Sequence, residues 1–205
     1  MYAGLGGGEL VVLDHIRFLR RKGVATTLLL FEDGPLVDRA KAEGASVRVL
    51  PFTWGGGKFR SGSRVLKQVV RALELLARRR HDLVVSYTFN DLILVGLAAR
   101  FTGVPLVYRA QGDVFGPAAD GGDTWLGSYL PKMMRFLRPT LLPTTAGEAE
   151  RLRTRGWGPV TTVPLGVRLP EAANQKQAPQ LRQNLGWGAN VPIVALFGRL
   201  IPWKG

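Results

Sequence analysis

The sequence contains no cysteine and only two histidines. The absence of cysteine excludes disulfides, thiolate metal sites and cysteine nucleophiles. The two histidines, His15 and His81, lie far apart in the sequence and lack the spacing of metal ligands, so we expect no zinc site. Function classes that depend on thiol chemistry or on bound zinc are therefore not expected.

Long hydrophobic runs are also absent. The longest apolar-rich stretch, residues 92–101, is too short to span a bilayer, which takes about 20 residues. The N-terminus shows no charged-then-apolar pattern of a secretory signal peptide. These features are compatible with a cytoplasmic location.

Acidic residues are scarce, because 15 Asp and Glu stand against 28 Lys and Arg, which gives a net charge of +13. Such an excess favours anionic partners: phosphates, nucleic acid or a membrane surface. The basic residues occur in short groups near the ends of predicted helices, where cations complement the helix dipole. Because no single block resembles a nucleic-acid-binding arm, we do not expect a nucleic-acid partner.

Predicted strands alternate with predicted helices along most of the chain. Apolar, β-branched runs predict strands over 24–31, 46–51, 82–87, 104–110, 140–145, 160–164 and 192–197. Amphipathic or apolar patterns predict helices over 9–22, 34–43, 63–80, 90–102, 124–138 and 146–155, with a kink or break at Pro131. This alternation predicts an α/β fold, a Rossmann-like doubly wound parallel sheet.

The predicted sheet lacks its central strand. A doubly wound domain normally begins with that strand, yet only residues 1–5 precede the first glycine-rich turn and helix. We expect either that another segment fills the gap or that the native protein starts upstream of Met1. The predicted domains are 1–167, a Rossmann-like unit, then a linker over 168–190 and the first strand and loop of a truncated second domain over 191–205.

Two glycine-rich loops are candidate binding segments. Gly7 and Gly8 stand at a predicted helix N-terminus, where free N–H groups attract phosphate, unless this terminus is simply flexible. A second loop, residues 53–62, carries Lys58 and Arg60 and could close over an acceptor substrate, or be a solvated surface loop. It is no P-loop, because Phe59 follows the lysine.

Two further loops follow predicted strands. Gln111 and Asp113 lie in the loop after the predicted strand over 104–110, where a substrate could bind, although Asp113 could instead cap the next segment. In the closing "GRLIPWKG", Arg199 offers a planar fork and Lys204 a point charge for phosphate oxygens. The alternative for this last pair is two solvated cations on a surface turn.

The order of these motifs resembles glycosyltransferase family 4, which has the GT-B fold of two facing Rossmann-like domains. The resemblance is carried by "GGGELVVLDHIRFLRRKG", "GPLVDRAKAEGASVRVLP", "TTAGEAERLRTRGW", "VTTVPLGV" and "FGRLIPWKG". It covers the N-terminal half of that fold and the opening of its second domain. Two positions depart from the family pattern: Gln111 stands where a histidine is frequent, and Leu165 where the crossover often has asparagine.

The resemblance implies a retaining transfer of a sugar from a nucleotide sugar to an acceptor, usually without a metal. It places Arg199 and Lys204 on the donor phosphates, and Gly7 and Gly8 near the donor diphosphate and acceptor. The implied acceptor is a cell-envelope glycan or a lipid-linked molecule, reached by peripheral contact with an anionic membrane at the cytoplasmic face. The predicted helix over 124–138 is the candidate for that contact, unless it packs in the core.

We expect this chain alone to have negligible transferase activity, because the nucleotide-binding domain of the family would follow Gly205. The alternative function is a non-catalytic half-enzyme or acceptor-binding module that pairs in trans with a donor-binding chain. A third interpretation is an unrelated Rossmann-like phosphate binder, for which Glu32 and Asp33 would be the acidic residues after the strand.

Overall fold

The chain divides into two compact units, Met1–Leu165 and Gly166–Gly205. The computed structural model describes residues 6–51, 62–79, 81–110, 125–166, 182–188 and 191. The described part of the second unit contains a short helical turn at 182–184, and Arg182 donates hydrogen bonds of 3.0 Å to the carbonyls of Gly188 and Val191. The predicted domain boundaries at 167 and 190 stay predictions.

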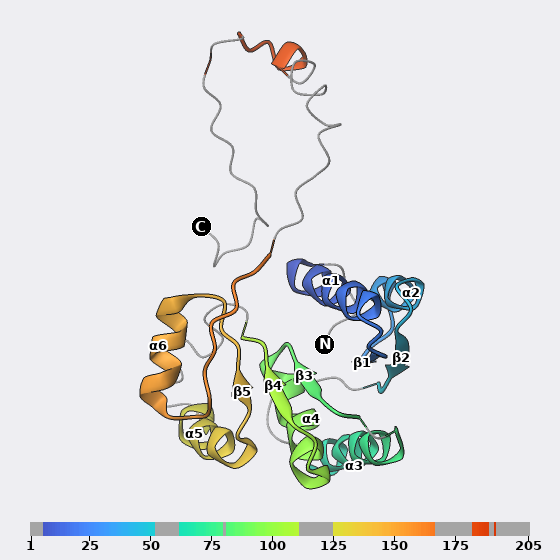
Figure 1. Cartoon of the computed structure of the whole chain (residues 1–205), viewed down its shortest axis with the longest axis vertical. Helices are drawn as coiled ribbons and strands as arrows, with labels where there is room; N and C mark the ends of the chain where they lie inside the picture. The colour runs from blue at the N-terminus through green and yellow to red at the C-terminus, as the bar shows by residue number, and fades with distance from the viewer. Residues whose placement is uncertain are drawn as a thin grey trace. The chain divides into compact units, whose positions relative to one another are not determined.

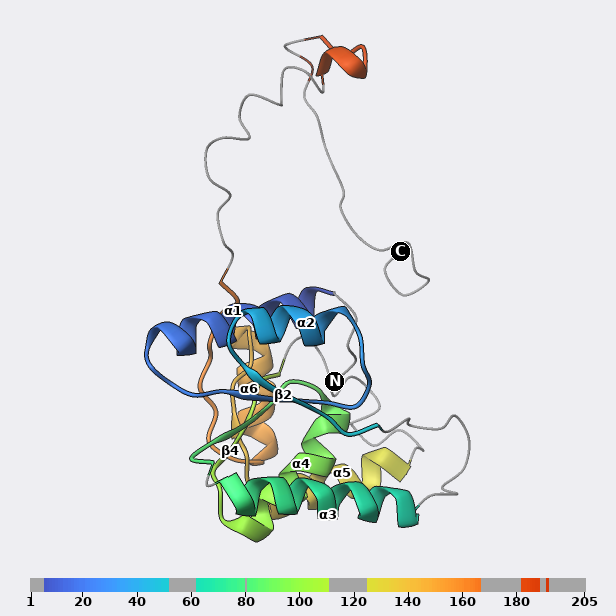
Figure 2. The same ribbon diagram turned by 90° about the vertical axis from the view of Figure 1, so that its right-hand side faces the viewer.

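Helices and strands alternate through the first unit, so the predicted fold class is confirmed. The order is α1 (Gly7–Arg21), β1 (Thr27–Leu30), α2 (Pro35–Ala42), β2 (Ser46–Val49), α3 (Gly62–Arg79), β3 (Val84–Ser86), α4 (Phe89–Thr102), β4 (Leu106–Tyr108), α5 (Trp125–Leu137), β5 (Thr140–Leu141) and α6 (Ala146–Arg155). The strands lie between layers of helices (Figure 1). Figure 2 shows α1 and α2 on one side of the strands and α3, α4 and α5 on the other.

The described strands form two parallel sheets instead of one. β1 pairs with β2, and β3, β4 and β5 pair in that order. Within the described ranges no strand joins β1 to β3. This break lies where the sequence predicts that the central strand is missing.

Each sheet has its own apolar cluster, and a third cluster bridges them. The first sheet packs with α1 and α2 through residues such as Val12, Ile16 and Leu36. The second packs with α3 to α6 through residues such as Leu92 and Met134. The bridging cluster joins residues that follow β1 to the helices of the second sheet: its buried members are Phe31, Val69 and Leu94. Apolar packing therefore holds the two sheets in one unit.

The boundaries of α4 and α6 follow directly from their sequences. The hydroxyls of Thr88 and Thr145 accept hydrogen bonds of 3.2 Å from the amides of Asp91 and Glu148 in the first helical turn, as N-cap residues do. Both helices end at a glycine with positive φ, Gly103 at 71° and Gly156 at 62°. Glycine adopts this left-handed conformation without the steric cost that a Cβ brings.

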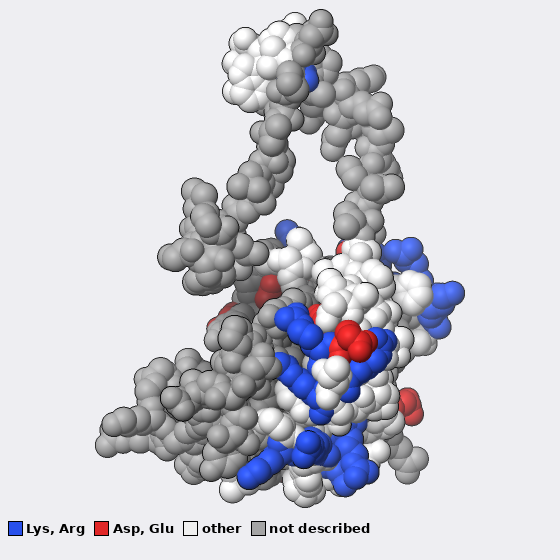
Figure 3. Space-filling view, turned by 90° about the vertical axis from the view of Figure 1, so that its left-hand side faces the viewer, with Lys and Arg blue, Asp and Glu red and all other residues white. Residues whose placement is uncertain are grey.

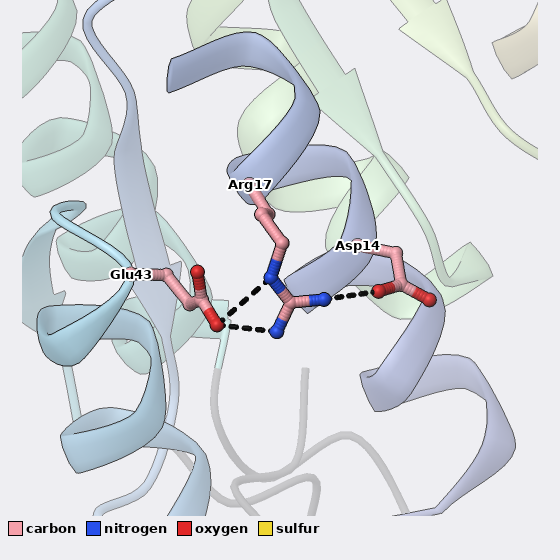
Figure 4. A network of polar contacts seen from close by, with 3 residues as sticks. All are labelled: Asp14, Arg17 and Glu43. Atoms are coloured by element: carbon pink, nitrogen blue, oxygen red, sulfur yellow. Dashed lines mark hydrogen bonds and ion pairs between the residues drawn. The ribbon is translucent and has the colours of Figure 1, made fainter. Parts of the chain in front are cut away.

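An ion-pair network fastens α1 to α2 (Figure 4). The Arg17 guanidinium donates to Asp14 Oδ1 at 2.6 Å, one turn away on the same helix. It also donates through Nε and Nη2 to the Glu43 carboxylate, which lies at the C-terminal end of α2. The hydrogen bond to Glu43 is the main cause that raises the pKa of Arg17. Because these side chains are partly exposed, water screens the ion pairs, and the network adds little to the stability of the fold.

Two sequence predictions about secondary structure need correction. Of the predicted kink or break at Pro131, the break does not occur, because α5 is continuous from Trp125 to Leu137, and the kink stays a prediction. Burial of Met134 and Leu137 in the core offsets the cost of about 3 kcal/mol that an internal proline brings to a helix. The predicted strand over 160–164 is reduced to a single bridge between Val160 and Leu141, although the amides of Thr161 and Val163 donate to the carbonyls of Leu141 and Pro143. Pro143 has no N–H to donate in return, and this limits the ladder. The strand predicted over 192–197 lies outside the described residues.

We predict that Leu92→Ala lowers the free energy of unfolding by about 2–5 kcal/mol, because it leaves a cavity in the main cluster. Leu92 is fully buried there. Leu66 on α3 is 63% exposed, so Leu66→Ala serves as the matched control and should change stability by less than about 0.5 kcal/mol. Urea unfolding of both variants measures the difference, and equal losses would contradict the assignment of this core.

Candidate functional site

Polar side chains gather where β3 and β4 end. Tyr87 and Arg109 follow these strands directly, at the edge where ligands bind in open parallel sheets. His15 reaches the same place from α1, because its Nδ1 lies 2.7 Å from the Tyr87 hydroxyl. We call His15, Tyr87 and Arg109 the strand-end cluster.

Arg109 is a buried cation held by backbone carbonyls. Its side chain is 2% exposed, and its two terminal nitrogens donate to the Leu142 carbonyl at 3.2 Å and to the Pro164 carbonyl at 3.3 Å. Its Nε is enclosed and has no partner among the described residues. Burial lowers the pKa of Arg109, while Tyr87 and Glu148 act in the opposite direction. Arg109 thereby fixes the segments after β5 and after α6 next to the end of β4.

The contact between His15 and Tyr87 links residues that are 72 positions apart. Burial is the main cause that raises the pKa of Tyr87 to about 12, so its phenol is protonated at neutral pH and can donate to a neutral His15. Burial, and then the charge of Arg109, lower the pKa of His15. Asp14 acts in the opposite direction, but the neutral imidazole is favoured.

Two acidic side chains lie near this cluster, at the first turns of α4 and α6. Asp91 is 9% exposed and Glu148 is 5% exposed. Burial is the main cause that raises the pKa of Tyr108, and the charges of Glu148 and Asp91 raise it further. Negative charge at a helix N-terminus complements the helix dipole. Glu148 also acts on Arg109, so this carboxylate balances part of the buried positive charge.

The first predicted glycine loop has a definite structure. Gly7 and Gly8 are the first residues of α1, and Gly6 is its N-cap. The Glu9 carboxylate accepts the Gly6 N–H at 3.0 Å, so it already occupies one of the free amides at this helix end. A Cβ added at Gly7 would meet nothing within 4 Å, which leaves that backbone accessible. A ligand phosphate that used the amide of Gly6 would have to displace Glu9.

The remaining predicted site residues lie outside the described residues and stay predictions: Lys58, Arg60, Gln111, Asp113, Arg199 and Lys204. In the part of the chain that is described, no group of three His, Cys, Asp or Glu could hold a metal ion. Sequence reasoning missed His15, Tyr87 and Arg109 as a group. The sequence held one signal for this group: Arg109 is a charged residue that comes directly after a buried strand.

We predict that acid destabilises the chain partly through His15. Because the pKa of His15 is lowered in the fold, the unfolded chain binds the proton first as the pH falls through about 6.5, its unperturbed value. Stability should therefore drop between pH 7.5 and 5 more steeply in the wild type than in His15→Gln. Urea unfolding at both pH values measures the two slopes, and parallel slopes would show that His15 is not held neutral.

Comparison with known proteins gives the family of this chain. The family described as "Glycosyl transferase 4-like domain" matches residues 6–166. A glycosyltransferase from Rickettsia africae is similar in structure, with a TM-score of 0.71 and 15% identity, and Anabaena Alr3699/HepE in complex with UDP and glucose has a TM-score of 0.68 and 24% identity.

Each of these alignments covers 100% of this chain and 53% of the other, so the chain spans about half the length of these proteins. At such identities the structural likeness concerns the fold alone. A search of curated proteins found no match. The family match covers most of the chain and confirms the resemblance seen in its motifs, so the chain belongs to the glycosyl transferase 4-like family.

Proposed function

We propose that this chain forms the acceptor-side half of an enzyme that transfers a sugar from a nucleotide sugar to an acceptor with retention. The observation that carries this proposal is the family match over residues 6–166. The Anabaena protein of similar fold was solved with UDP and with UDP-glucose, which supports a nucleotide sugar as the donor. The strand-end cluster lies at the edge of the sheet where such a ligand would bind.

On the donor side, Arg199 and Lys204 would bind the diphosphate. As the bond between sugar and phosphate breaks, negative charge develops on the leaving nucleoside diphosphate, and two cations stabilise it there. The guanidinium of arginine suits two phosphate oxygens at once, and the lysine ammonium adds a compact charge. With these cations in place the chemistry needs no metal, and Gly7 leaves room for the diphosphate near α1.

On the acceptor side, the half-buried His15 and Tyr87 would present hydrogen-bonding groups to a hydroxyl-rich molecule. The buried Arg109 fixes the end of β4, and Gln111 and Asp113 follow it within four positions of the sequence. Gln111 would donate and accept hydrogen bonds to sugar hydroxyls, as its amide allows. Lys58 and Arg60 would close over an anionic part of the acceptor.

A basic surface over α5 and α6 supports an acceptor at an anionic membrane. Figure 3 shows Lys and Arg gathered on this face, with few acidic side chains among them. The exposed or partly exposed basic residues there are Lys132, Arg135, Arg138, Arg151, Arg153 and Arg155. Each such residue near an anionic bilayer contributes about 1 kcal/mol of attraction. Among the described residues, no helix has the length and hydrophobicity that crossing a bilayer requires.

We predict that the purified chain binds UDP and that the double variant Arg199→Ala/Lys204→Ala binds it at least about tenfold more weakly, a loss of about 1.4 kcal/mol. The matched control is Lys41→Ala/Arg78→Ala, which removes the same charge from exposed positions on α2 and α3. Isothermal titration at one fixed salt concentration measures the affinities. Equal weakening in both double variants would contradict the proposal.

A further inference from the structure

Two phenylalanines lie exposed and in contact near the ends of α4 and α5. Phe101 is 68% exposed and Phe136 is 46% exposed. Their ring centroids are 6.4 Å apart, and the rings meet edge to face at an angle of 62°. Exposed apolar side chains that are scattered singly are ordinary, whereas adjoining ones with a polar rim mark interaction sites. We call the surface formed by Arg100, Phe101, Lys132 and Phe136 the aromatic-basic patch.

Close packing of the two helices brings these rings together. Gly96 of α4 has no side chain, and a Cβ at this position would lie 3.0 Å from Cδ1 of Leu137 on α5. Leu137 is buried in the main apolar cluster. Leu137 therefore fastens the end of α5 to α4 from the inside, and its neighbour Phe136 remains on the outside, in contact with Phe101.

Arg100 holds this arrangement from the surface. Its guanidinium lies 5.5 Å from the centre of the Phe136 ring, and its Nε donates a hydrogen bond of 3.2 Å to the Phe136 carbonyl. The two contacts fix the side chain before a ligand binds, which lowers the entropic cost of binding. Among the described residues, no group accepts a hydrogen bond from the terminal nitrogens of Arg100. These nitrogens can therefore donate to a carboxylate of a ligand.

The charges that α4 and α5 place around the rings have one sign. Lys132 is exposed and lies one turn before Phe136, on the same face of α5, because residues four apart are neighbours on a helix. The sequence of α5 contains no Asp or Glu, and the only acidic residue of α4 is Asp91. Asp91 stands in the first turn of α4, about 15 Å along the helix from Phe101. The patch therefore complements a negatively charged ligand.

The aromatic-basic patch and the strand-end cluster lie at opposite edges of the sheet. α4 begins just after Tyr87 and runs for 14 residues, which is a length of about 21 Å. Both α4 and α5 lead directly into the start of a strand, β4 or β5. Phe101 and Phe136 thus lie where the parallel strands begin, whereas Tyr87 and Arg109 lie where they end. A ligand of the patch is therefore distinct from a substrate at the strand-end cluster.

We propose that the aromatic-basic patch binds an acidic segment of a partner protein, in which apolar side chains stand between carboxylates. The apolar side chains pack on the rings of Phe101 and Phe136, and the carboxylates accept hydrogen bonds from Arg100 and Lys132. Aromatic side chains and arginine are the common anchors of protein interfaces. Because the strand-end edge stays free, the chain can hold this partner and a substrate together, and the contact does not depend on the proposed reaction.

An anionic bilayer is the other surface of matching charge. A bilayer that touched the patch would leave the strand-end cluster about 21 Å away, at the edge that faces away from the membrane. An acceptor in that bilayer would not reach the cluster. Contact along α5 and α6, as proposed above, keeps the strand ends beside the membrane. The two surfaces share Lys132 but suit different partners, and the geometry favours a protein at the patch.

Fluorescence anisotropy with three labelled peptides tests this proposal. The probe is acetyl-Asp-Glu-Leu-Trp-Glu-Asp with a dye at its C-terminus. One control has serine in place of Leu and Trp, and the other has Asn and Gln in place of the acids. We expect the 205-residue chain to bind the probe at least about tenfold more tightly than either control. If either control binds as tightly as the probe, charge alone or apolar contact alone explains the binding, and the proposal is overturned.

Two variants locate the binding. Phe18 on α1 is the matched control for Phe101, because it is 56% exposed and Lys22 Nζ lies 5.8 Å from its ring centre, but Asp14 stands one turn before it. We expect Phe101→Ser to weaken binding of the probe at least about tenfold and Phe18→Ser to leave it unchanged. Equal affinities of the two variants would overturn the proposal. Circular dichroism establishes that both are folded, and if Phe101→Ser is unfolded, the three peptides on the wild type still decide.

Other occupants give different results. If the chain dimerises in sedimentation and Phe101→Ser makes it monomeric, a second copy covers the patch and the proposal is overturned. Vesicles of phosphatidylcholine and phosphatidylglycerol in equal amounts test the bilayer. If Phe101→Ser weakens binding to these vesicles but not to the probe, the bilayer covers the patch, and the proposal is again overturned. Absence of probe binding to the wild type also overturns it.

Discussion

Between β1 and β3, side-chain packing joins two sheets that share no hydrogen-bonded ladder in the described part of the chain. Phe31 lies directly after β1 and packs with Val69 of α3 and Leu94 of α4, beneath the second sheet. On the other side, the hydrogen bond between His15 and Tyr87 fastens α1 to the end of β3. These two contacts help to hold the first sheet in place relative to the second.

The candidate site depends on the same junction. His15 belongs to the helix that covers the first sheet, while Tyr87 and Arg109 end strands of the second. The strand-end cluster therefore exists only while the two sheets keep their positions. Burial keeps the Tyr87 phenol protonated and favours a neutral His15 imidazole. Burial lowers the pKa of Arg109, but a guanidinium keeps its charge in proteins, and here two backbone carbonyls hold it. A site of this composition offers neutral hydrogen-bonding groups beside a buried cation, which suits a hydroxyl-rich ligand.

The fold could be predicted from the sequence to a large extent, because its signals are local. Apolar runs predicted the strands, the apolar pattern over 90–102 predicted α4, and the short segment before Gly6 predicted the break between β1 and β3. The errors came from longer-range effects. Core packing keeps α5 continuous through Pro131, and Pro143, which lacks an N–H, limits the pairing near Val160 to one bridge.

The site could be predicted less well, because its contacts are not periodic in the sequence. His15 and Tyr87 meet across 72 positions, and each taken alone resembles an ordinary half-buried residue. Arg109 stands beside the predicted Gln111 and Asp113, but its burial arises only from the folding of the segments that contain Leu142 and Pro164 around it. The family match supplies what these residues do not, namely the family to which the chain belongs.

Amide hydrogen exchange, measured residue by residue by NMR on the chain without added peptide, tests the break in the sheet most directly. The Val84 amide is bonded to the Pro105 carbonyl next to β4 and should exchange slowly, whereas the neighbouring Val85 amide faces the break between β1 and β3 and should exchange at least about tenfold faster. The same contrast is expected between Leu28 and Leu29 in β1. Equal protection of both members of each pair would show that β1 and β3 are already joined by a strand and would contradict the account.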